Sequence, residues 1–90
     1  MTDSAAALRL AAIRARLEAS LAPKFLEVRD DSHLHAGHEG ARDGRGHFHV
    51  TIQSARFQGL SVIARHRLVY AALADLMTTD IHALSISARS

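Results

Sequence analysis

The stretch that most constrains the fold of this 90-residue chain covers residues 56–83 and reads "RFQGLSVIARHRLVYAALADLMTTDIHA". A turn at Gly59 precedes Ser61, whose hydroxyl can cap a helix over residues 62–77. Apolar residues recur in this segment at helical spacing. They predict a buried stripe made of Val62, His66, Val69, Leu73 and Leu76, flanked by Tyr70 and Met77. A helix with one apolar stripe must pack on another element, so the rest of the chain has to supply a sheet.

The last part of the chain and its first half contain the pieces of such a sheet. After the turn "TTD", the segment "IHALSISA" predicts a last strand with Leu84 and Ile86 facing inward. Alternation in "FLEVRDDS" and "HFHVTIQS" predicts two earlier strands. The second of these buries Phe48, Val50 and Ile52 and turns His47, His49, Thr51 and Gln53 outward.

A first helix precedes these strands. Asp3 or Ser4 is a suitable N-cap, and Pro23 predicts that the helix ends near Leu21. Its apolar stripe consists of Leu10, Ile13, Leu17 and Leu21.

The expected order is therefore helix, strand, long loop, strand, helix, strand, which is an α+β fold of order α-β-β-α-β. The second and third strands should be parallel, because a helix connects them, and the crossover should be right-handed. The two helices would then cover one face of a three-stranded mixed sheet, as in a class II KH-like domain. With 90 residues and no linker, residues 1–90 are expected to form a single domain.

The composition excludes several functions. The chain has no cysteine, so it has neither a disulfide framework nor a thiolate ligand of its own. No apolar run approaches the roughly 20 residues that cross a bilayer. The Ala- and Arg-rich N-terminus carries Asp3 and Glu18, unlike a transit peptide, and we expect a cytoplasmic protein without membrane contact. No paired carboxylates, activated nucleophile or phosphate-binding loop stands out, so we do not expect an enzyme.

Histidine is the unusual feature of the composition: there are seven, and five lie between His33 and His49. The loop 32–46 contains four glycines, and loops of this length in small domains are usually functional or mobile. His47 and His49 have a spacing that can chelate Zn²⁺ or Cu²⁺, which we regard as incidental. His66 faces the core in the helix pattern and is interpreted as structural. His82 shares strand parity with Leu84 and Ile86, so the pattern alone favours a core or edge histidine.

The order of the predicted helices and strands and the sequence motifs together resemble the BolA family. "FQGLSVIARHRLVYAALADLM" is similar to its turn-and-helix signature, and "IHALSI" is similar to the entrance of its last strand. "LEVRDDSHLH" and "HFHVTI" resemble its first two strands, so that the resemblance extends from about Ile13 to Arg89.

The resemblance implies partnership with a monothiol glutaredoxin, in which the two proteins share a [2Fe–2S] cluster for iron–sulfur trafficking or iron regulation. It implies that the BolA side supplies two histidine ligands: His82, from "IHAL", and His35, from the loop. His33 and His38 remain alternatives to His35, because the loop "SHLHAGHEG" is crowded. The partner's cysteine and glutathione would provide sulfur. We expect a monomer when the chain is alone and a heterodimer with glutaredoxin, with Arg65 and Arg67 on the docking surface.

A nucleic-acid-binding transcriptional regulator is the alternative, because KH-like folds bind single strands and some BolA proteins are described as regulators. Arg56, Arg65 and Arg67 surround the turn and helix. Against it, a KH domain clamps the backbone with G-x-x-G between two helices, and the match here, residues 37–40, lies between two strands. The formal net charge is only +2, so DNA binding is the weaker hypothesis.

Overall fold

The computed structural model describes residues 4–32 and 46–90, and within these residues it confirms the α+β architecture. Helix α1 (Ser4–Leu21) precedes strand β1 (Phe25–Asp30), and strand β2 (Gly46–Gln53) leads through the short 3-10 helix η3 (Ala55–Phe57) to the second half. Helix α2 (Val62–Ala72), helix α3 (Ala74–Met77) and strand β3 (Ile81–Arg89) complete the chain. The described part of the loop predicted at 32–46 is limited to its two ends.

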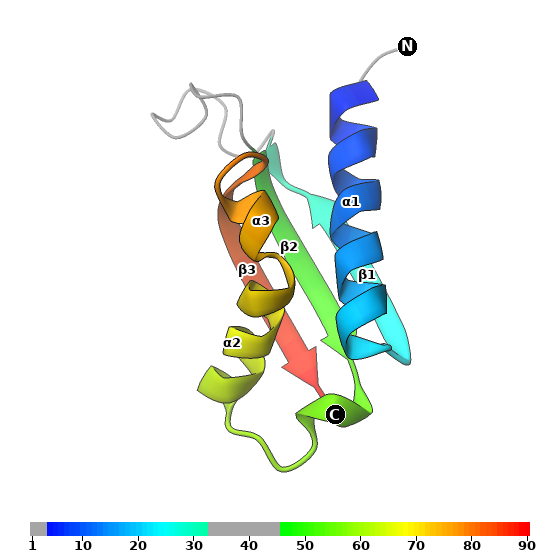
Figure 1. Cartoon of the computed structure of the whole chain (residues 1–90), viewed down its shortest axis with the longest axis vertical. Coiled ribbons are helices and arrows are strands. Elements are labelled where there is room, and N and C mark those ends of the chain that lie inside the picture. The colour runs from blue at the N-terminus through cyan, green and yellow to red at the C-terminus, as the bar shows by residue number, and fades with distance from the viewer. Residues whose placement is uncertain (1–3, 33–45) are drawn as a thin grey trace.

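The strands form one sheet in the order β1-β2-β3, with β1 antiparallel and β3 parallel to β2. Helices α1, α2 and α3 lie on the same side of this sheet, with α1 next to α2 and α3 (Figure 1). The sheet is therefore mixed and covered on one face, as predicted from the helical connection between β2 and β3.

A single hydrophobic core lies between the helices and the sheet in the described residues. The predicted stripe of α1 is buried from Ile13 onward, and the inward residues of β2 are buried as expected. The core residues are Ile13, Leu17, Leu21, Phe48, Val50, Ile52, Phe57, Val69, Leu73, Leu76 and Ile81. None of the described helices has the length and hydropathy needed to span a membrane.

The helix predicted over residues 62–77 is wrong in two details. It is interrupted at Leu73, whose backbone (φ −104°, ψ 11°) leaves the helical region and separates α2 from α3. No glycine or proline marks this position, so no local signal could reveal the break. Val62 is 66% exposed rather than buried, because the first turn of α2 lies beside β3 and not over the sheet (Figure 1). The Ser61 cap is confirmed: its hydroxyl accepts a hydrogen bond of 3.1 Å from the Ala64 amide.

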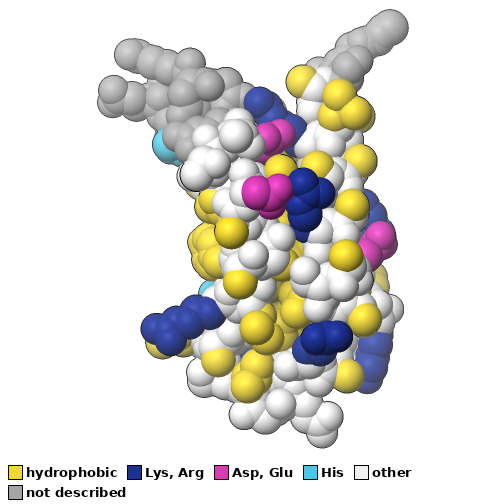
Figure 2. All heavy atoms as spheres, in the orientation of Figure 1, with side chains coloured by type: hydrophobic (Ala, Val, Ile, Leu, Met, Phe, Trp, Pro, Cys, Tyr) yellow, Lys and Arg dark blue, Asp and Glu magenta, His cyan; other side chains and the backbone are white. Residues whose placement is uncertain are grey.

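Charges of both signs are interspersed among hydrophobic side chains on the helical face (Figure 2). Little of the described histidine side chains is visible on this face, and only at the edge of the molecule (Figure 2). The register explains this, because the outward residues of β2, including His47 and His49, point to the face of the sheet opposite the helices.

Candidate metal centre

A β-bulge at the start of β3 determines where His82 lies. In the pairing of β2 with β3, Gly46 faces Ile81 but the next residue, His47, faces Ala83. His82 is therefore the extra residue of the bulge. The Gly46 amide donates a 2.9 Å hydrogen bond to the Asp80 carbonyl, which joins the start of β2 to the residue before β3, next to the bulge.

The bulge changes the side to which His82 points. Ile81 is fully buried and Leu84 faces inward opposite Phe48, while His82 between them is exposed. Strand parity grouped His82 with Leu84 and Ile86 and favoured a core or edge histidine; the core alternative is wrong, because His82 is exposed. Regular alternation assumes an unbroken ladder, whereas one extra residue shifts the alternation by one position.

Glycine is required at position 46, on the strand opposite the bulge. A Cβ atom built there would lie 2.7 Å from the Phe48 ring and 2.8 Å from the Ser32 hydroxyl oxygen. Either distance is too short for a real contact, so a side chain at position 46 would push Phe48 out of the core or displace Ser32. The absence of a side chain at Gly46 thus lets Phe48 and Ser32 approach its backbone closely.

His47 is the nearest described histidine to His82. Their ring centroids are 5.3 Å apart and the rings are tilted by 53°. Sequence reasoning paired His47 with His49 instead and did not connect it with His82. The signal was nevertheless available: parallel strands joined by a crossover begin at the same edge of a sheet, so residues at the start of β2 and of β3 become neighbours.

The backbone of His47 is held by the end of β1. Its amide donates to the Ser32 hydroxyl (3.0 Å), and its carbonyl accepts from the Asp31 amide (2.8 Å). A cavity of about 190 Å³ lies beside it, lined by Asp31, His47, Phe48, Ala83, Leu84 and Ser85. His49, two residues along the same face, shares a hydrogen bond with Ser85 through its Nδ1 atom.

The second predicted ligand, His35, and its alternatives His33 and His38 lie outside the described residues. The assignment of the second ligand therefore stays a prediction. His66 is half-buried on α2, compatible with the structural role expected of it.

The two arginines predicted on the docking surface differ in their surroundings. The Arg65 guanidinium donates to the Leu60 carbonyl (3.0 Å) and to the Ala88 carbonyl (3.2 Å), and thus ties the start of α2 to the end of β3. Arg67 is exposed. Only Arg67 therefore presents a guanidinium that is not engaged with backbone carbonyls of the described chain.

The donors at this edge of the sheet fit a metal that accepts imidazole nitrogen. Within residues 4–32 and 46–90, no three His, Cys, Asp or Glu side chains gather closely enough to hold an ion by themselves. A cysteine-free chain with an exposed histidine fits a shared cluster in which sulfur comes from elsewhere, because imidazole can replace thiolate on one iron of a [2Fe–2S] cluster.

Comparison with known proteins identifies the family. A family model described as "BolA-like protein" matches residues 17–90, which is most of the chain. This chain belongs to the BolA family. The match covers His47, His82 at the bulge, and the arginines of α2.

Individual BolA relatives agree with this assignment. The chain is 49% identical over 80 residues to human BolA-like protein 1, covering 89% of this chain and 56% of that protein. It is 43% identical over 74 residues to a Vibrio cholerae protein named DNA-binding transcriptional regulator BolA, covering 82% and 67% of the two chains. The chain thus spans only slightly more than half the length of the human relative.

Solved BolA structures have the same fold. The BolA domain of SufE1 from Arabidopsis thaliana superimposes with a TM-score of 0.79 at 43% identity, covering 99% of this chain and 94% of that one. BolA1 from the same plant gives a TM-score of 0.76 at 38% identity, covering 90% and 89%. The α+β fold with helices on one face of a mixed sheet is therefore that of the family.

Proposed function

We propose that this protein is the partner of a monothiol glutaredoxin and shares a [2Fe–2S] cluster with it in iron–sulfur trafficking or iron regulation. The observation that carries the proposal is the exposure of His82 at the bulge. A ligand that is to meet a cluster held by a second protein must project from the surface, and the bulge turns this imidazole outward. The family assignment supports the proposal independently.

In this proposal His82 supplies one imidazole ligand and His35 supplies the second, while the partner's cysteine and glutathione supply the sulfur. The cluster would provide the redox and transfer chemistry. The chain's own contribution is to hold His82 in an exposed, fixed position through the Gly46–Asp80 hydrogen bond and the pairing on either side of the bulge. An imidazole binds a metal through a deprotonated nitrogen, so acid is expected to weaken the shared cluster.

The test is co-expression with a monothiol glutaredoxin in the presence of glutathione, followed by co-purification and visible circular dichroism. We expect a one-to-one brown complex for the wild type and for the control His66→Ala, and a cluster that is lost or short-lived for His82→Ala. A wild-type spectrum and cluster lifetime in His82→Ala would show that His82 is not a ligand. His35→Ala should weaken the cluster more than His38→Ala does, and the reverse order would move the second ligand along the loop.

DNA binding is the second candidate, favoured by the name of the Vibrio cholerae relative, DNA-binding transcriptional regulator BolA. The small net charge and the engagement of Arg65 with two carbonyls weigh against it. If the chain binds DNA, the affinity should fall steeply with salt and drop on substitution of Arg67. The absence of enzymatic activity and the cytoplasmic location stay predictions.

A further inference from the structure

The pair of rings at the bulge is compatible with coordination of a single ion. A metal ion about 2.1 Å from a coordinating imidazole nitrogen lies about 3.2 Å from the ring centroid, so a tetrahedral angle places two such centroids about 5.2 Å apart. His47 and His82 have centroids 5.3 Å apart, and their rings are tilted by 53° rather than stacked in parallel. The separation of the two rings is thus that expected of two imidazoles bound to one ion.

Ordinary aromatic packing gives a similar spacing, about 4.5–7 Å between centroids, so distance alone is insufficient. Three further observations favour an ion. His82 is exposed, so an ion can enter from solvent and the ring can adjust. His47 is half-buried and its backbone is fixed by Asp31 and Ser32, so one ligand is already positioned. Asp31, an acidic residue, lines the cavity beside His47, where its carboxylate also pairs with Arg29 at 2.8 Å.

We propose that His47 and His82 form a two-imidazole site that binds one divalent transition-metal ion, of the class of Zn²⁺, on this chain alone. The remaining coordination positions would be taken by water, because no third described side chain is placed to ligate. The site is distinct from the His35–His82 pair of the proposed function and needs no partner protein. Since both use His82, a chain that carries such an ion would have to release it before sharing a cluster.

The site can be tested on the full chain after treatment with a chelator, by calorimetric titration with Zn²⁺ alone at neutral pH. We expect one ion per chain. His47→Ala and His82→Ala should each weaken binding at least about tenfold, since even losing a residue that only supports a ligand costs roughly 10- to 100-fold in metal affinity. The imidazole nitrogen signals of His47 and His82 should shift on addition of Zn²⁺ in NMR spectra.

Two matched controls separate this site from the other histidines. His49→Ala removes the neighbour on the same strand face and should leave the affinity unchanged. The triple variant His33→Ala/His35→Ala/His38→Ala removes the loop histidines and should also retain one site. His47→Gln keeps a polar side chain at this position and shows whether weaker binding in His47→Ala reflects loss of the ligand or misfolding. A circular-dichroism melt measures the stability of each variant.

Three results would overturn the proposal. Equal losses in His47→Ala and His49→Ala with none in His82→Ala would indicate a chelate within β2. Loss of binding in the loop variant would assign the ion to the loop. No binding by the wild type would make the two rings an aromatic contact only. None of these results involves glutaredoxin, so each is separate from the outcome of the cluster experiment.

Discussion

At the scale of single residues, Ser54 is the buried polar side chain on which several elements converge. It is fully buried, and its hydroxyl donates to the Leu21 carbonyl at the end of α1 (2.6 Å) and accepts from the Arg56 amide (3.1 Å). Its own amide donates to the Arg89 carbonyl at the end of β3 (2.9 Å). One residue thus satisfies backbone groups of a helix end and of the turn after β2.

Ser54→Ala should therefore destabilise the protein by about 1–3 kcal/mol, because the buried Leu21 carbonyl and the Arg56 amide would each lose a partner. Chemical denaturation followed by circular dichroism measures this loss. Ser87→Ala is the matched control, since Ser87 is exposed on β3 and its replacement should change stability by less than about 0.5 kcal/mol. Equal stability of the two variants would mean that water replaces the Ser54 hydroxyl.

At the scale of elements, the strands and helices could be predicted because their residues repeat with period 2 or 3.6. The inward residues of β2 and the α1 stripe from Ile13 to Leu21 are examples. The helix break at Leu73 and the bulge at His82 could not be predicted, because both arise from how segments far apart in the chain pack. The bulge determines the exposure of His82. Strand alternation predicts which side chains of a regular strand are buried, and this prediction failed at His82, where the pairing of β2 with β3 is irregular.

The same scale explains why His47 was not connected with His82. The two residues are 35 positions apart in the chain, so only the parallel pairing of β2 with β3 makes them neighbours. The resemblance to the BolA family supplied His82 from the motif "IHAL" and not from any pattern of burial. Recognition of a motif and physical pattern reasoning thus gave different interpretations of the same residue; the structure shows that His82 is exposed, and its role as a ligand stays a prediction.

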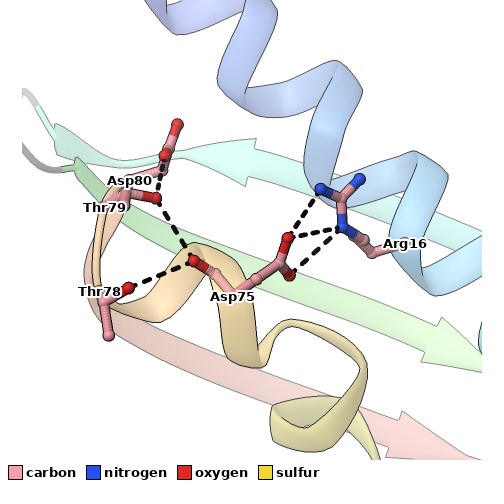
Figure 3. A network of polar contacts seen from close by, with 5 residues as sticks. All are labelled: Arg16, Asp75, Thr78, Thr79 and Asp80. Carbon is pink, nitrogen blue, oxygen red and sulfur yellow. Dashed lines mark hydrogen bonds and ion pairs between the residues drawn. The ribbon is translucent and has the colours of Figure 1, made fainter.

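Helix α1 is joined to the corner between α3 and β3 by ion pairs. The Asp75 carboxylate accepts three hydrogen bonds from the Arg16 guanidinium, at 2.8, 3.1 and 3.3 Å, while Thr78 and Thr79 donate to the backbone carbonyl of Asp75 (Figure 3). Arg9 lies 3.5 Å from Asp80. The hydrogen bond from Arg16, with its positive charge, lowers the pKa of Asp75.

A lowered carboxyl pKa in the folded state means that the ionised form favours folding. The stabilisation is fully present above the pKa of the unfolded carboxyl, about 3.9, and is lost as the pH falls through the lower folded value. Asp75→Asn should therefore lower the melting temperature slightly at neutral pH and not at the acid end of a pH series. The effect should shrink at high salt, because the pair is largely exposed. Glu27→Gln is the control, because Glu27 is exposed on β1. A difference between Asp75→Asn and the wild type that persists in acid would contradict the role of the ion pair.

At the scale of the whole molecule, an effect on glutaredoxin docking can be distinguished from an effect on stability by comparing the variants of two neighbouring arginines. Arg65→Glu would break the bonds to Leu60 and Ala88, and its stability should fall by on the order of 2 kcal/mol. Arg67→Glu alters an exposed side chain, so its melting temperature should stay near that of the wild type. If an acidic partner meets this surface, Arg67→Glu should slow association at low salt, and the difference should narrow as salt is added.

The measurement is a kinetic binding experiment with the glutaredoxin, run beside a thermal melt of each variant. Lys24→Glu reverses an exposed charge outside the helix and controls for the change in net charge. If Arg67→Glu keeps the wild-type stability and associates more slowly than Lys24→Glu, the partner contacts α2, the helix that carries Arg67. Equal association rates for the two variants would remove Arg67 from the interface, and the contact would then depend on the strand edge that carries His82. That result would leave cluster sharing intact and change only the surface through which the partner approaches.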